Sequence, residues 1–89
     1  MIFLNHYRFK EGKSQDAVQR RLEKGIGTPE GTSVLGEWTR ADGTGGYLIF
    51  ETDKPEYAWT LQWSDLLDMD VIPLYDTEKD VMKLFKGAS

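Results

Sequence analysis

The sequence predicts an α+β domain in which two helices cover one face of a four-stranded antiparallel sheet, followed by a short C-terminal helix. Three features point to this class. Residues 1–9 are rich in β-forming and apolar residues. Residues 41–46 give a hairpin signal, because Asp-Gly and Gly-Gly tolerate the positive φ of tight turns. Pro73 lies in the last β-rich segment, and a proline without a ladder N–H belongs on an edge strand.

The first half of the chain is expected to form a strand, a helix and a second strand. Residues 1–9 carry apolar side chains on both faces, which is typical of a central strand. Ser14 is a candidate N-cap for the first helix, which Gly25 and Gly27 should end. The second strand is expected over residues 33–40. The apolar positions of the helix recur every four residues, at Val18, Leu22 and Ile26.

The second half should contain two strands and two helices. The strands are expected over residues 47–52 and 70–75. Asp53 and Glu56 form a capping-box pattern at the start of the second helix, and Thr77 can cap the last one. The apolar positions of the two helices are Trp59, Trp63, Leu66 and Leu67 in the first, and Val81, Leu84 and Phe85 in the second.

The element order β-α-β-β-α-β, with right-handed crossovers, gives a ferredoxin-like sheet. Its first and third strands lie in the middle, and both helices lie on one face. The other face keeps apolar residues, and apart from the tail nothing in the chain is expected to cover it. A homodimer that packs sheet against sheet would remove that face from water.

Composition limits the class of protein. With 89 residues the chain is expected to be one domain spanning residues 1–89, and a domain this small gains much from a second subunit. The absence of cysteine excludes disulfides and thiolate metal sites. A net charge of −4 without a basic run argues against nucleic-acid binding. No apolar run approaches the ~20 residues that span a bilayer, and no signal peptide is recognisable, so a cytoplasmic location is expected.

His6 is the only histidine, and it has two interpretations. It could act as a general base or ligand, because its ordinary pKa lies near neutrality. It could equally be an ordinary hydrogen-bonded strand residue, which is the interpretation we favour. His6 alternates in phase with Ile2 and Leu4, so it could face the helices, but alternation alone leaves its sheet face open. No nucleophile motif accompanies it.

The acidic residues at the end of the second helix, Asp65, Asp68 and Asp70, also have two interpretations. Their oxygens could hold a divalent cation, but the spacing matches no calcium loop. Salt bridges to arginine are favoured, because carboxylates near a helix C-terminus need compensation. The candidate partners are Arg8, Arg20, Arg21 and Arg40. No metal site is therefore expected, and the glycines of residues 43–46 fit a hairpin better than a phosphate loop.

Three tryptophans, four tyrosines and four phenylalanines could fill the core of a domain this small. They could also line an apolar pocket in which Asn5, Tyr7 and the indole N–H groups supply the polar contacts.

Several segments resemble the domain-of-unknown-function family numbered 3303: residues 1–10, 29–31, Trp38, 42–43, 51–55, and, most specifically, 63–68 and 71–73. The resemblance implies the dimeric α/β-barrel superfamily, in which two ferredoxin-like sheets pack face to face. That superfamily includes small monooxygenases, haem-degrading enzymes, isomerases and non-enzymatic ligand binders. The haem-degrading branch has a first-strand asparagine and a helix tryptophan, similar to Asn5 and Trp59 or Trp63. Its axial histidine in the second helix has no counterpart in this chain.

One hypothesis is a homodimeric, cofactor-independent enzyme, similar to a monooxygenase or an isomerase, that acts on a small apolar or aromatic molecule, although a single histidine and the absence of cysteine count against catalysis. Asn5, His6 or Tyr7 would position or deprotonate the substrate. Trp38, Trp59 and Trp63 would shape the cavity. The alternatives are a non-enzymatic small-ligand-binding or regulatory module, and a purely structural dimer.

Overall fold

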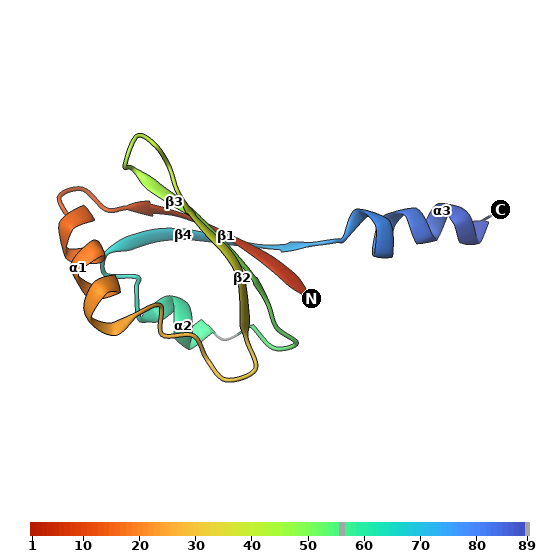
Figure 1. The fold of residues 1–89 in the computed structure, drawn as a ribbon, viewed down its shortest axis with the longest axis horizontal. Helices are drawn as coiled ribbons and strands as arrows, with labels where there is room; N and C mark the ends of the chain where they lie inside the picture. Colours follow the sequence, from red (N-terminus) through yellow and green to blue (C-terminus); the bar gives the residue numbers. More distant parts are fainter. Residues whose placement is uncertain (56, 89) are drawn as a thin grey trace.

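A computed structural model describes residues 1–55 and 57–88. Its four strands are β1 (Ile2–Phe9), β2 (Ser33–Thr39), β3 (Gly45–Glu51) and β4 (Leu67–Leu74). Its helices are α1 (Ser14–Lys24), α2 (Tyr57–Leu61), the π-helical turn η1 (Thr77–Val81) and α3 (Met82–Ala88). Helices α1 and α2 lie together on one side of the sheet (Figure 1). No helix in the described ranges has both the length and the apolar character needed to cross a membrane.

The strands form one antiparallel sheet in the order β2-β3-β1-β4. This confirms the predicted α+β class and its ferredoxin-like arrangement, with β1 and β3 in the middle. Phe3 pairs with Phe50 on one side and with Pro73 on the other. Pro73 therefore lies on edge strand β4, where its missing N–H interrupts no central ladder.

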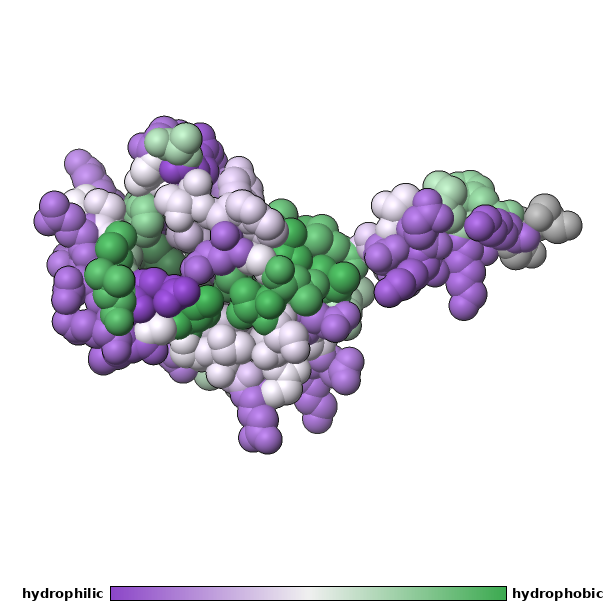
Figure 2. Space-filling view, viewed as in Figure 1, coloured by the Kyte–Doolittle hydropathy of each residue, from purple (hydrophilic) through white to green (hydrophobic). Residues whose placement is uncertain are grey.

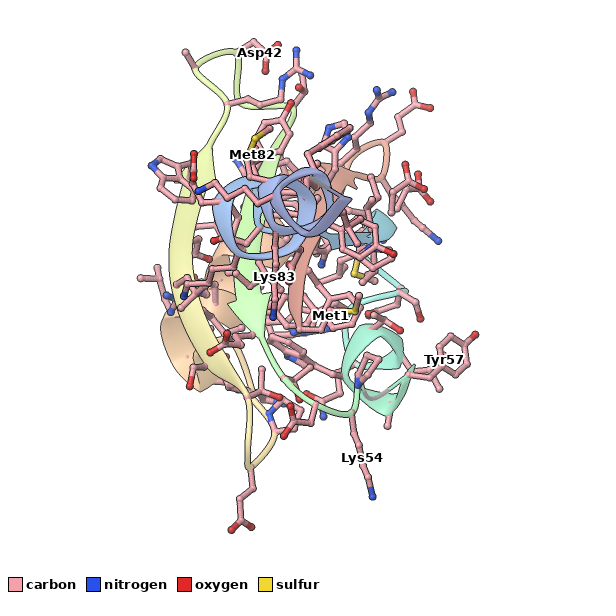
Figure 3. The ribbon with its side chains drawn as sticks, turned by 90° about the vertical axis from the view of Figure 1, so that its right-hand side faces the viewer. Met1, Asp42, Lys54, Tyr57, Met82 and Lys83 are labelled. Carbon is pink, nitrogen blue, oxygen red and sulfur yellow. The ribbon has the colours of Figure 1, made fainter. Side chains whose placement is uncertain are left out.

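The hairpin between β2 and β3 forms at the predicted Asp-Gly step. Gly43 has a φ of +73°, which a glycine adopts without strain. Asp42 Oδ1 accepts hydrogen bonds from the Thr44 hydroxyl at 2.7 Å and the Thr44 N–H at 3.1 Å. The Thr44 hydroxyl, followed by the Arg40 guanidinium, lowers the pKa of the Asp42 carboxyl to about 2. Asp42 marks the hairpin tip in Figure 3. The next two glycines belong to β3 rather than to the turn.

Helix α2 is shorter than its apolar pattern predicted. It ends at Leu61, and the chain continues in tight turns until β4 begins at Leu67. The hydroxyl of Ser64 donates to the Leu61 carbonyl, a side-chain bond to the backbone that competes with regular helix. Lys10 N–H donates to the Leu66 carbonyl, which attaches this turn to the end of β1.

Two predicted helix caps are wrong. The N-cap of α1 is Lys13, which makes no side-chain capping bond, and Ser14 is already helical. Before η1 the cap is Asp76 rather than Thr77. Asp76 Oδ1 accepts from the Lys79 N–H at 2.8 Å, and the Asp76 N–H donates to Asp80 Oδ2 at 2.7 Å. The capping box proposed for Asp53 involves Glu56, which lies outside the described residues.

The core lies between the sheet and the two helices. One buried cluster contains Phe3, Leu48, Phe50 and Trp59, and a second contains Ala17, Leu66 and Leu67. The rings of Phe3 and Phe50 stack with centroids 5.3 Å apart. Trp59 packs edge-on against Phe50, with centroids 4.9 Å apart. Trp63 contacts both clusters, so the predicted apolar stripe does pack inward although its helix ends early.

The opposite side of the sheet has no helix over it, as Figure 1 shows. The strand register places Ile2, Leu4, His6, Tyr47, Ile49 and Ile72 on this side, which we call the open face. The C-terminal arm, residues 75–88, extends away from the body of the domain and does not cover the open face (Figure 1), where Ile72 is exposed and the named residues of β1 and β3 are half-buried. The expectation that the tail could cover this face is therefore wrong for a single chain.

Candidate functional site

A cleft of about 1480 Å³ lies between the sheet and helices α1 and α2. Its sheet wall includes Asn5, Tyr7, Leu48, Phe50 and Val71. Its other wall includes Val18 and Leu22 of α1, Trp59 of α2, and Trp63 in the turns that follow α2. Val18 and Leu22 are exposed and line the cleft, whereas Ile26, the third position of the predicted apolar stripe, lies beyond the end of α1 and packs against the core. Most of these side chains are apolar or aromatic, as in small-molecule sites generally.

The two tryptophans of the cleft are held by one backbone atom. The Nε1 atoms of Trp59 and Trp63 both donate to the carbonyl oxygen of Ile26, at 3.0 and 3.1 Å. This shared acceptor links the segment after α1 to α2 and to the turns that follow α2, and it fixes the position of both indole rings. Both indole N–H groups are therefore occupied, which corrects the expectation that they are polar contacts for a ligand. The rings offer apolar surface instead.

Asn5 and Tyr7 supply the polar groups of the sheet wall. Asn5 Oδ1 is buried and has no hydrogen-bond partner among the described residues. Burial raises the pKa of the Tyr7 hydroxyl above its ordinary value of 10.0, and the charge of Glu37 raises it further. Tyr7 is therefore neutral at physiological pH and can donate its proton in a hydrogen bond.

Gly46 gives Tyr7 its position. The two residues pair across β1 and β3, and a Cβ atom at Gly46 would collide with the Tyr7 ring. Only glycine leaves room for the ring there. Sequence reasoning assigned this glycine to the hairpin turn and missed its role in the site.

The charged groups around the cleft balance one another. Arg21 and Glu37 form an ion pair with Nη2 and Oε1 3.1 Å apart. This hydrogen bond raises the pKa of the Arg21 guanidinium. Lys10 and Asp68 add one further charge of each sign to the lining. The cleft thus has no excess of either charge.

The six residues predicted for the site divide between the two faces. Asn5, Tyr7, Trp59 and Trp63 line the cleft. His6 and Trp38 do not, because each lies on the opposite side of its strand. The His6 ring stacks on Tyr47 with centroids 4.7 Å apart, and its buried Nε2 has no partner in the described ranges. His6 therefore lies on the face away from the helices, a choice that the alternation had left open, since Phe3 and Tyr7 occupy the helix side.

The family model for a domain of unknown function, DUF3303, matches residues 1–88. The chain belongs to the DUF3303 family. No curated protein and no solved structure matches it. Because the description of DUF3303 names no activity, the function of this member has to be argued from its own site.

The acidic corner of this DUF3303 chain is organised by arginine. Arg20 donates two hydrogen bonds to Asp65, at 2.8 and 2.7 Å, which confirms the salt-bridge interpretation for that carboxylate. The Arg20 hydrogen bond lowers the pKa of Asp65. Asp68 and Asp70 lie instead on β4, opposite Arg8 and His6 of β1. Within the described ranges, no group of three acidic or histidine side chains could hold a metal ion.

Proposed function

We propose that the cleft binds a small, uncharged apolar or aromatic molecule that carries a hydroxyl or similar polar group. The observation that supports this most is the buried Asn5 Oδ1, which lacks a partner beside an aromatic-lined cleft. An unsatisfied buried acceptor costs about 1–3 kcal/mol. A ligand that donates a hydrogen bond to Asn5 would remove that cost.

Tyr7 complements Asn5 in this proposal. The neutral Tyr7 hydroxyl can donate a hydrogen bond to an oxygen of the ligand, and Asn5 Oδ1 can accept a hydrogen bond from the ligand's hydroxyl. The balanced charges of Arg21, Glu37, Lys10 and Asp68 favour an uncharged ligand over an ion. The rings of Trp59 and Trp63 would hold its apolar part.

A second candidate is catalysis without a cofactor, of the monooxygenase or isomerase kind. The juxtaposition of Asn5 and Tyr7 in an apolar cleft favours it, because a neutral tyrosine can act as a general acid toward a substrate oxygen. Conversion of a compound that binds the cleft, abolished in Tyr7→Phe, would support the enzyme. Binding without conversion would leave a ligand-binding or regulatory module.

The proposal includes a homodimer of the dimeric α/β-barrel kind. The open face presents Ile2, Leu4, Ile49 and Ile72 without a covering helix, and Trp38 beside them is 56% exposed. Apolar patches of this kind mark interaction surfaces. Packing the open faces of two copies against each other, around a two-fold axis, would bury the same residues on both.

The test of the ligand proposal compares 2-naphthol with 2-methoxynaphthalene, which has the same ring but no hydroxyl donor. We expect saturable binding of 2-naphthol, measured by NMR shifts of the Trp59 and Trp63 indole N–H groups. Asn5→Leu should weaken 2-naphthol binding about tenfold, which corresponds to ~1.4 kcal/mol, and leave the ether unchanged. Native mass spectrometry of the protein from its own host should also show a retained small molecule.

If neither probe binds and no small molecule is retained, the proposal is wrong and the purely structural dimer is favoured. If both probes bind equally and Asn5→Leu changes neither, the cleft binds apolar molecules without the hydrogen bond that we assign to Asn5.

A further inference from the structure

The C-terminal arm carries apolar side chains that are exposed in the single chain. Leu84 is 73% exposed and Phe85 68%, and Tyr75 is also exposed. Helix α3 contacts η1, and the two together project from the end of β4 (Figure 1). The space-filling view shows apolar surface on the arm and more on the body where the arm departs (Figure 2). The apolar side chains of Leu84 and Phe85 therefore do not pack against the described body of the domain.

An isolated arm of this length has little reason to be helical. η1 contains 5 residues and α3 contains 7. Helices shorter than roughly 12–15 residues are marginal in water, and most helices in proteins are stabilised by packing of an apolar face. Val81, Leu84 and Phe85 follow the three- and four-residue spacing that places side chains on one face. Met82 and Lys83 project from different sides of the helix in the view along the arm (Figure 3).

The arm leaves the sheet beyond the end of β4 (Figure 1). The reciprocal hydrogen bonds between Asp76 and the segment Lys79–Asp80 cap the start of η1. To reach its own open face, the arm would have to reverse at the short link between β4 and η1. A second molecule can bind the arm in the position that the arm already occupies.

We propose that the arm of each chain packs on the body of a second copy, so that the homodimer exchanges its C-terminal arms. This inference rests on the homodimer of the proposed function. The charges of α3 favour a second copy, since α3 carries Lys83 and Lys86 and no acidic residue, whereas residues 75–81 of the arm are acidic and the whole chain has a net charge of −4. Two-fold symmetry would make the contact twice, once for each arm.

The expected contact on the partner is the Asp68 end of β4. Asp70 lies on the open side of the sheet beside His6, and Asp68, which also lines the cleft, lies at the end of β4 remote from its own arm. A two-fold axis that runs across the strands places this end beside the arm of the other copy. Leu84 and Phe85 would then pack near the partner's open face, with Lys83 close to these carboxylates.

The direct test uses a dimer mixed from ¹³C-labelled and unlabelled full-length chains. We expect NOEs between the Leu84 and Phe85 side chains of one copy and residues of the other. Intermolecular NOEs that involve the sheet but not the arm would overturn the arm exchange. NOEs from the arm to its own body would overturn it too.

A second measurement separates the arm from the sheet interface. By sedimentation velocity, Leu84→Ser should weaken dimerisation about tenfold, or ~1.4 kcal/mol, while Glu78→Ser, an exposed control on η1, should change it less than twofold. If Leu84→Ser has no effect but Ile49→Lys dissociates the dimer, the arm proposal fails and the sheet interface stands. The reverse pattern supports the arm and rejects the sheet interface. A chain that stays monomeric overturns both.

Discussion

The two faces of the sheet differ although they are built from alternate residues of the same strands. On β1, Phe3, Asn5 and Tyr7 face the helices, whereas Leu4 and His6 face away. The covered face combines a buried aromatic core with a cleft that contains an unpaired acceptor. The open face has apolar residues at its centre, with Asp70 and Glu51 nearer its ends, and no described helix covers it. Adjacent residues of one strand therefore serve different purposes: one lines a cleft suited to a small molecule, and the next lies on a surface suited to a protein partner.

The largest expected difference between the faces is in stability. Phe50→Ala removes a buried ring that stacks on Phe3 and contacts Trp59. It should lower the free energy of unfolding by about 3–5 kcal/mol, measured by urea denaturation at low protein concentration. The neighbouring substitution Ile49→Ala, on the half-buried open face, should cost less than about 2 kcal/mol in the monomer. Equal losses would contradict the assignment of the core to the covered face.

The second expected effect is on assembly. Ile49→Lys places a charge in the centre of the open face and should weaken the proposed dimer at least about tenfold, because an unpaired buried charge is costly. Sedimentation velocity over a concentration series measures this. Thr28→Lys adds the same charge at an exposed loop position and should leave the dimer intact. Dissociation by both variants would indicate a general charge effect instead.

The third effect concerns the cleft and uses neighbouring residues of β4. Val71 lines the cleft and Ile72 lies on the open face. Val71→Phe should fill part of the cleft and weaken 2-naphthol binding about tenfold in calorimetry. Ile72→Phe adds a ring of the same size on the other face and should change this affinity less than twofold. The opposite ranking would place the ligand on the open face.

The smallest effect is a titration at high pH. The raised pKa of Tyr7 means that its contribution to stability is fully present below pH 10.0 and is lost as the pH rises through the higher pKa of the folded state. Tyrosinate absorbance, measured as wild type minus Tyr7→Phe, should show a tyrosine that ionises above pH 10.0. A tyrosine that ionises below that value would contradict the burial of Tyr7 on the covered face.

The sequence predicted the order of the strands because their signals are local. Alternation in residues 1–9, the Asp42-Gly43 step and Pro73 each determine one feature of the sheet, and each is confirmed. The face of His6 could not be predicted, since Ile2 and Leu4 share its alternation and are as apolar as the residues opposite. What decides it is the packing of distant Phe50 and Trp59 against Phe3.

The cleft itself could be predicted only in part. Asn5, Tyr7 and the two helix tryptophans were identified as candidates from their residue types. The roles of Gly46 and of the Ile26 carbonyl depend on contacts between segments far apart in the chain. The irregularity between Val34 and Gly36 in β2 also shifts its register by a residue, which alternation alone does not reveal.

The carbonyl of Ile26 that holds Trp59 and Trp63 has a consequence for how this chain can change. Every amino acid supplies a backbone carbonyl, so substitutions at position 26 do not delete the acceptor. The side chains that line the cleft can therefore be exchanged while the two indole rings keep a common anchor. A mutational scan of the chain should find that position 26 accepts other apolar residues, which keep its packing against the core, and that both tryptophans are intolerant, although all three meet at the same oxygen atom.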